Sequence, residues 1–238
     1  IELAESPWKE GHKLVRIGLQ AKAVDRRERP AANLVFLVDV SGSMEPENKL
    51  PLVKRSLRLL LDKLTDRDRV GIVTYAGESR VAAEPTGVSA AGKAKLLGVI
   101  EGLRAGSGTH GSAGIQMAYA MATNQFNREH VNRVILCTDG DFNVGITDRG
   151  ELLNFITERA KSGVFLSVLG YGLGNYKDGT MELLADKGNG NYAYVDSFTE
   201  ARKVLSEQLE GTLVTIAKDV KVQVEFNPAR VKSYRLLG

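Results

Sequence analysis

Short, uninterrupted apolar runs alternate along the chain with segments whose apolar residues recur every three or four positions. The runs are rich in branched residues and cover residues 34–38, 134–137 and 164–169, and residues 70–75 are a fourth candidate. Such runs are typical of strands buried on both faces of a parallel sheet. The segments between them have the spacing of amphipathic helices, as at Leu50, Val53 and Leu57. This alternation predicts a doubly wound, mostly parallel α/β sheet with helices on both faces.

The two ends of the chain show a different pattern, with apolar and polar residues in strict alternation. The alternation is seen at residues 15–21 and 220–226 and is typical of half-buried antiparallel strands, so we interpret residues 11–24 and 219–237 as parts of a small β unit. We therefore expect an N-terminal β segment at 1–30, an α/β domain at 31–217, and a C-terminal β segment at 218–238 that pairs with the N-terminal one. Because the chain opens on Ile1 and ends in a strand-like run, we interpret it as a piece of a longer protein.

The composition narrows the class of partner. The 238 residues are 43% hydrophobic, carry a formal net charge of +3 and include 6% aromatic residues. The charges alternate in sign along the chain, so no basic block indicates binding to nucleic acid or to a membrane surface. No apolar run approaches the length of a membrane span, so we expect no direct membrane insertion. The single cysteine, Cys137, excludes an intrachain disulfide.

The loop after the first buried strand carries the candidate chemistry. Asp39, Ser41 and Ser43 place a carboxylate and two hydroxyls at every second position, around Gly42. On a tight turn all three oxygens can converge on one point. Hard oxygen ligands of low total charge suit Mg²⁺ or Mn²⁺, which retain waters and leave coordination positions open. The alternative is a helix N-cap, which needs no metal.

Two further segments are expected at the same edge of the sheet. One is the Gly106–Thr109 loop before a helix, and the other is Thr138-Asp139-Gly140 after the 134–137 strand. With these in register, the Asp39-x-Ser41-x-Ser43 sequence resembles the metal-ion-dependent adhesion site of von Willebrand factor type A domains. The resemblance covers roughly residues 31–217.

The resemblance implies a role for each matching residue. The hydroxyls of Ser41, Ser43 and Thr109 would bind the cation, and Asp39 and Asp139 would bind it directly or through waters. The cation would be Mg²⁺, with Mn²⁺ or Ca²⁺ as alternatives. The remaining coordination position would take an Asp or Glu carboxylate of a protein partner, because the site supplies too few charges to neutralise the cation.

The resemblance also implies a location and a binding surface. Residues 138–145 and 187–192 look like the bacterial, envelope-associated branch of the family, which implies a periplasmic or surface-exposed protein. Side chains around the site would form a rim that contacts the partner. The candidates for this rim are His110, Phe142, Tyr171 and Tyr176.

Two other functions remain open from the residues. In a metal-assisted phosphoester hydrolase, Asp39 would be the nucleophile and a second acid two residues later would serve as acid and base. Ser41 occupies that place, and a hydroxyl cannot do this work near neutral pH. We therefore expect a binding module that is not an enzyme. The third possibility is a structural module in which the metal site is vestigial.

Overall fold

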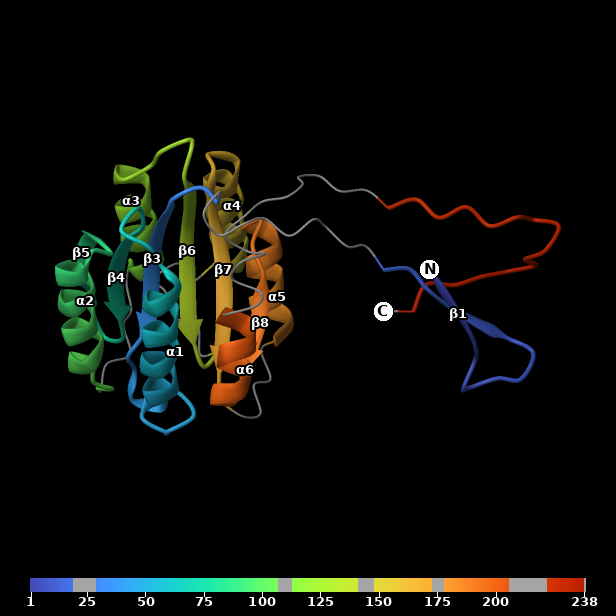
Figure 1. Cartoon of the computed structure of the whole chain (residues 1–238), viewed down its shortest axis with the longest axis horizontal. Helices are drawn as coiled ribbons and strands as arrows, with labels where there is room; N and C mark the ends of the chain where they lie inside the picture. The colour runs from blue at the N-terminus through green and yellow to red at the C-terminus, as the bar shows by residue number, and fades with distance from the viewer. Residues whose placement is uncertain (19–28, 107–112, 141–147, 173–177, 206–221, 238) are drawn as a thin grey trace.

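A six-stranded sheet forms the centre of the α/β unit (Figure 1). The computed structural model describes residues 1–18, 29–106, 113–140, 148–172, 178–205 and 222–237. The strands of this sheet are β3 (Ala32–Asp39), β4 (Arg69–Tyr75), β5 (Ser79–Gly87), β6 (Val131–Thr138), β7 (Val164–Tyr171) and β8 (Tyr192–Val195). Their order is β5-β4-β3-β6-β7-β8. Only the β4–β5 pair is antiparallel within this sheet, so the prediction of a mostly parallel sheet is confirmed.

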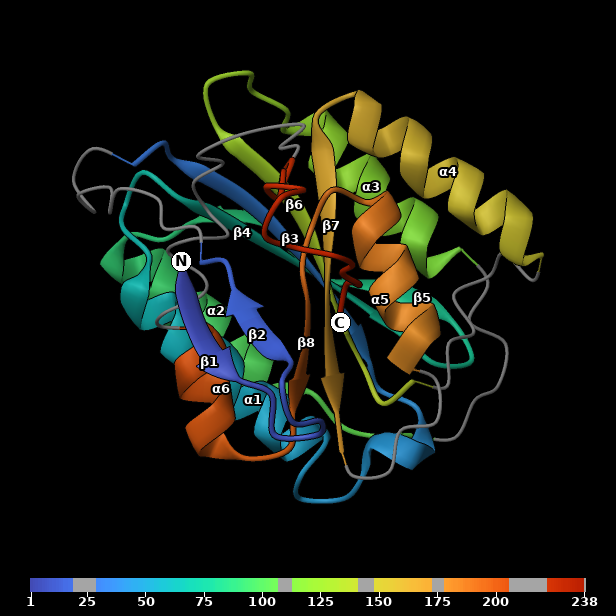
Figure 2. The same ribbon diagram turned by 90° about the vertical axis from the view of Figure 1, so that its right-hand side faces the viewer.

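Helices cover both faces of the sheet (Figure 2). One face carries α1 (Leu50–Lys63), α2 (Ala90–Gly102) and α6 (Phe198–Lys203), and the other carries α3 (Gly114–Asn124), α4 (Arg149–Lys161) and α5 (Asp178–Lys187). Alternate residues of β3 serve the two cores: Phe36 packs towards α1, and Leu37 packs towards α3. This two-sided burial explains why residues 34–38 of the strand are all apolar. Each described helix is too short or too polar to traverse a lipid bilayer.

The order of the strands creates a switch point between β3 and β6. From β3 the chain adds β4 and then β5 on one side, and later returns to add β6 on the other side. The two strands are parallel and in register, with Val38 opposite Cys137, so they end at the same edge. Helices on opposite faces diverge at such a point and leave a crevice beyond the strand ends. Asp39 and Thr138 end these two strands and therefore lie side by side at this edge of the sheet.

The small antiparallel sheet differs from the expectation. It consists of β1 (Glu2–Glu5) and β2 (Lys13–Arg16), and both strands belong to the N-terminal part of the chain. Residues 222–237 contain no strand, so the predicted pairing of the two chain ends is wrong for these residues. Neighbouring strands need only a short loop to meet, which lowers the entropy lost on pairing. Alternation of residues predicts the faces of a strand but does not identify its partner.

Candidate functional site

Asp39 is held by donors from three neighbouring strand ends. Its side chain is buried, and Oδ1 accepts a hydrogen bond from the backbone N–H of Ser41 at 2.9 Å. Its Oδ2 accepts hydrogen bonds from the Tyr75 hydroxyl at 3.1 Å and from the Thr138 hydroxyl at 3.3 Å. Tyr75 ends β4 and Thr138 ends β6, on either side of β3. The sheet therefore fixes the orientation of this carboxylate.

The environment of Asp39 disfavours its charge. Burial raises the pKa of the Asp39 carboxyl, and the hydrogen bonds from Ser41 offset this only in part. The nearby negative charge of Asp139 raises the pKa further, which shows that the two carboxylates interact. Burial also raises the pKa of Tyr75 well above its usual value, so its hydroxyl stays protonated and donates. A divalent cation between the two carboxylates would relieve their repulsion.

The two serines present their hydroxyls to each other. Ser41 follows β3, and Ser43 lies in a short 3-10 helix, η1 (Gly42–Met44). Their Oγ atoms are 3.0 Å apart. Adjacent oxygen ligands of an octahedral Mg²⁺ lie about 2.9 Å apart, given metal–oxygen distances of roughly 2.0–2.1 Å. The distance between the two hydroxyl oxygens therefore fits two neighbouring coordination positions of Mg²⁺. The N-cap alternative is not supported for Ser41, because its side chain makes no capping hydrogen bond to η1.

Asp139 and the serine loop are joined by Lys49. The ammonium of Lys49 donates to Asp139 Oδ2 at 2.8 Å and to the Ser43 carbonyl at 2.9 Å. The side chain of Asp139 is only 3% exposed and that of Lys49 is 22% exposed. Asp139 follows β6 directly, and Lys49 precedes α1. The residues that the sequence predicts on separate segments thus meet around one cationic group.

The donor set agrees with a hard divalent cation. Four of the five predicted ligands are described, and they come together at the β3–β6 edge: Asp39, Ser41, Ser43 and Asp139. Two carboxylates with two hydroxyls are the oxygen ligands that Mg²⁺ accepts. In the described part of the chain, no three His, Cys, Asp or Glu side chains gather as a metal cluster, so the hydroxyls are needed for any site here.

The fifth predicted ligand, Thr109, lies outside the described residues. The chain reaches the site shortly before it, because Gly106 pairs with Ser41 in a parallel bridge. The backbone N–H of Gly106 donates to the Val40 carbonyl at 2.9 Å. The Gly106 segment is therefore attached to the same loop that carries the serines.

The predicted partner rim is corrected at one residue. Tyr171 is 1% exposed and packs in the core, because the last residue of β7 points towards the α1 face. It cannot contact a partner from that position, so this prediction is wrong. His110, Phe142 and Tyr176 lie outside the described residues.

Two residues of the site were not anticipated from the sequence. The sequence shows Tyr75 only as the end of a candidate strand, although its register opposite Asp39 places it at the same edge of the sheet. Lys49 has no periodic or motif signal. Its position six residues after Ser43 is the one feature of the sequence that could have drawn attention to it.

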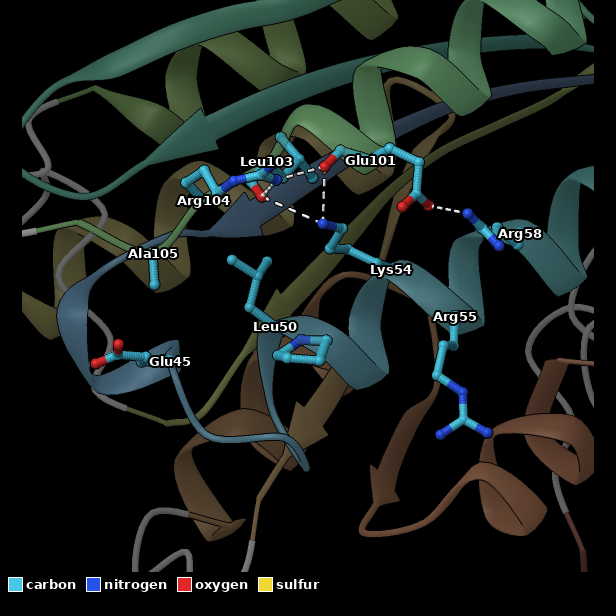
Figure 3. A pocket seen from close by; sticks show the side chains of 10 residues that line it. Glu45, Leu50, Lys54, Arg55, Arg58, Glu101, Leu103, Arg104 and Ala105 are labelled. Atoms are coloured by element: carbon cyan, nitrogen blue, oxygen red, sulfur yellow. Dashed lines mark hydrogen bonds and ion pairs between the residues drawn. The ribbon is translucent and has the colours of Figure 1, made fainter.

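A basic pocket of about 600 Å³ lies between α1 and the C-terminal end of α2 (Figure 3). Lys54 and Arg104 both donate to the carbonyls of Glu101 and Leu103, and Arg58 forms an ion pair with the Glu101 side chain. Cations at a helix C-terminus satisfy its last carbonyls and its dipole. These groups therefore have a structural explanation within the chain.

Comparison with known proteins identifies the family of the chain. The family model of the von Willebrand factor type A domain matches residues 33–208, and the model of the C-terminal region of uncharacterized protein YfbK matches residues 211–238. Uncharacterized protein YfbK of Escherichia coli (strain K12) is 46% identical over 237 residues. That alignment covers 100% of this chain but 41% of the relative, so the chain spans about two fifths of its length.

Solved structures share the fold at low sequence identity. The von Willebrand factor type A protein from Catenulispora acidiphila has a TM-score of 0.64 and 19% identity, over 77% of this chain and 43% of that one. An aerotolerance-related membrane protein from Bacteroides fragilis NCTC 9343 has a TM-score of 0.59 and 19% identity, over 76% of this chain and 100% of that one. On its fold and its matched residues, the chain belongs to the von Willebrand factor type A domain family, whose members commonly mediate protein–protein interaction and adhesion.

Proposed function

We propose that this chain is a divalent-cation-dependent protein-binding module. Mg²⁺ would be held by Asp39, Ser41, Ser43 and Asp139, with Thr109 as the fifth residue of the family pattern. The observation that carries this proposal is the meeting of two interacting, buried carboxylates with a hydroxyl pair 3.0 Å apart, at the switch point of the sheet. The side chains of the site are polar, but the strands that hold them are buried at every residue of β3 and at all but the first residue of β6.

The bound cation would capture an Asp or Glu carboxylate of a partner protein. Four or five protein ligands leave at least one of the six coordination positions of Mg²⁺ to water, and an incoming carboxylate oxygen can replace that water. Mn²⁺ and Ca²⁺ are the alternative cations. The partner itself is defined here only by this acidic group.

A binding role is favoured over phosphoester hydrolysis by the residue two positions after Asp39. Ser41 occupies that position, and its hydroxyl lies against Ser43 rather than beside a base. An acid at that place would be needed for proton transfer to the leaving group. We therefore propose that the module acts by binding.

A location in the bacterial cell envelope is supported by the membrane protein from Bacteroides fragilis that shares its fold.

Nuclear magnetic resonance can test carboxylate capture without knowledge of the partner. Acetate is the simplest carboxylate probe, and acetamide is its uncharged counterpart. With saturating Mg²⁺, acetate should shift the amide signals of Ser41, Gly42 and Asp139, whereas acetamide should not. The shifts should vanish with EDTA and in Asp39→Asn. Equal shifts with acetamide, or shifts that persist in EDTA, would contradict cation-mediated capture.

A further inference from the structure

The side chain of Lys49 reaches across the candidate cation site. It lies just before α1, yet its ammonium contacts the carboxylate of Asp139, which follows β6. Its second bond goes to the carbonyl of Ser43 in the serine loop. These two contacts, at 2.8 and 2.9 Å, place a positive charge between the loop and the opposite carboxylate.

The path of the Lys49 side chain is defined by its surroundings. Its aliphatic part lies against Gly172, where an added Cβ would come within 2.8 Å of the Lys49 Cε. Gly172 has a φ of +103°, a conformation that side-chain-bearing residues rarely adopt. The side chain is 22% exposed, so the ammonium is partly shielded from water. Its interaction with Asp139 is therefore stronger than that of a surface ion pair.

Asp139 is the point at which Lys49 and a divalent cation compete. The Oδ2 atom that accepts the Lys49 hydrogen bond belongs to a predicted metal ligand. A divalent ion within bonding distance of Asp139 would lie close to an ammonium, and the two positive charges would repel each other. The same ammonium offsets part of the repulsion between Asp139 and Asp39 when no divalent ion is present.

We propose that Lys49 sets the cation affinity of this site by acting as a built-in counterion that a divalent cation must displace from Asp139. This inference rests on the proposed function, because it assumes that the site binds Mg²⁺. It adds a determinant that is not among the five predicted ligands. Lys49 stabilises the metal-free protein and weakens metal binding by the same contact.

Isothermal titration calorimetry of Mg²⁺ into wild-type protein and Lys49→Met separates these effects. Without the competing charge, the variant should bind Mg²⁺ at least about tenfold more tightly. In EDTA its melting temperature should fall below that of the wild type, since Asp139 loses its counterion, and saturating Mg²⁺ should remove this difference. Lys49→Arg, which keeps the charge, should stay close to the wild type in affinity.

Lys93→Met is the matched control. Lys93 also forms an ion pair, at 2.6 Å with Asp62, and is 30% exposed, but it bridges α1 and α2. Its loss should leave Mg²⁺ affinity unchanged. If the wild type bound Mg²⁺ and Lys49→Met bound it equally well or more weakly, the role of Lys49 would be overturned. The proposed function would not be affected by that result. If neither protein bound Mg²⁺, the proposed function would fail and the role of Lys49 with it.

Discussion

Within the described residues, carboxylates are buried at both edges of the central sheet, and their partners differ. Asp68 lies directly before β4. Its carboxylate accepts hydrogen bonds from two guanidinium nitrogens of Arg29, at 2.9 and 2.5 Å, and from the backbone N–H groups of Ala32 and Thr65. Burial by itself would raise the pKa of Asp68, but these hydrogen bonds and the charge of Arg29 outweigh it and hold the pKa below its usual value. At the opposite edge of the sheet, burial leaves the pKa of Asp39 raised.

The difference lies in the charge of the partners. Asp39 is held by neutral donors, the N–H of Ser41 and the hydroxyls of Tyr75 and Thr138. These fix its direction but do not cancel its charge. The charge of a buried carboxylate that pairs with an arginine is neutralised within the protein. A carboxylate that is oriented by neutral groups keeps its charge and is suited to binding a cation. This contrast agrees with a structural role for Asp68 and with the binding role that we propose for Asp39.

The largest effect is expected from Asp68→Asn. The substitution leaves the buried guanidinium of Arg29 without its carboxylate, so the free energy of unfolding should fall by about 3–5 kcal/mol in urea denaturation. Glu101→Gln is the control, because the Arg58–Glu101 pair is about half exposed on both sides. It should cost less than about 1 kcal/mol. Similar losses of unfolding free energy in the two variants would contradict a larger structural role for Asp68 than for Glu101.

Asp39→Asn should instead affect the response to Mg²⁺. At 100 times its dissociation constant, Mg²⁺ should stabilise the wild type by about 2.7 kcal/mol. The variant should gain nothing from Mg²⁺, yet in EDTA its stability should stay within about 1 kcal/mol of the wild type, because the lost charge was disfavoured by burial. Thermal unfolding with Mg²⁺ and with EDTA measures both. A large loss in EDTA would mean that Asp39 is structural.

The dependence of stability on pH should have opposite signs for the two carboxylates. Asp68 has a lowered pKa, so its contribution is complete above the unfolded value of 3.8 and is lost as pH falls through the folded value. Asp39 has a raised pKa, so its ionisation costs stability as pH rises from 3.8 through the folded value in metal-free protein. Urea denaturation of wild type, Asp68→Asn and Asp39→Asn across acidic pH should show these slopes. Identical slopes would refute the contrast.

The smallest effect concerns the hydroxyl donors. Tyr75→Phe removes a hydrogen bond to Asp39 and should cost about 1 kcal/mol in EDTA. Tyr119→Phe provides the comparison, since no described group bonds the buried Tyr119 hydroxyl. That variant should be neutral or slightly more stable in urea denaturation. Equal losses in both would indicate packing rather than hydrogen bonding.

The elements that the sequence predicted well are those with strong apolar patterns. β3 extends over the predicted 34–38 run because each of its residues is buried. β5 was not expected, since it is an edge strand in which Val81 is 41% exposed and the apolar pattern is weak. The alternation within residues 219–237 predicts a strand, but the described part of that range, residues 222–237, contains none, because the pattern says nothing about a partner.

The residues of the site also differ in how well the sequence predicts them. Asp39, Ser41 and Ser43 could be recognised because they are close in sequence, and Asp139 because it follows a buried strand. The hydroxyl of Tyr75 and the ammonium of Lys49 reach the site through strand register and side-chain conformation. Neither is encoded by spacing. Tyr171 failed as a rim residue because a strand end can point into the core as easily as outward.

A titration of Mn²⁺ followed by electron paramagnetic resonance tests the central claim most directly. The free-ion signal reports unbound Mn²⁺, which replaces Mg²⁺ at sites of this kind. We expect one saturable site in the wild type, competition by Mg²⁺, and no such site in Asp39→Asn, which should remain folded. Saturable binding that is equal in the wild type and Asp39→Asn, or no binding to the folded wild type, would contradict a cation site at the β3–β6 edge.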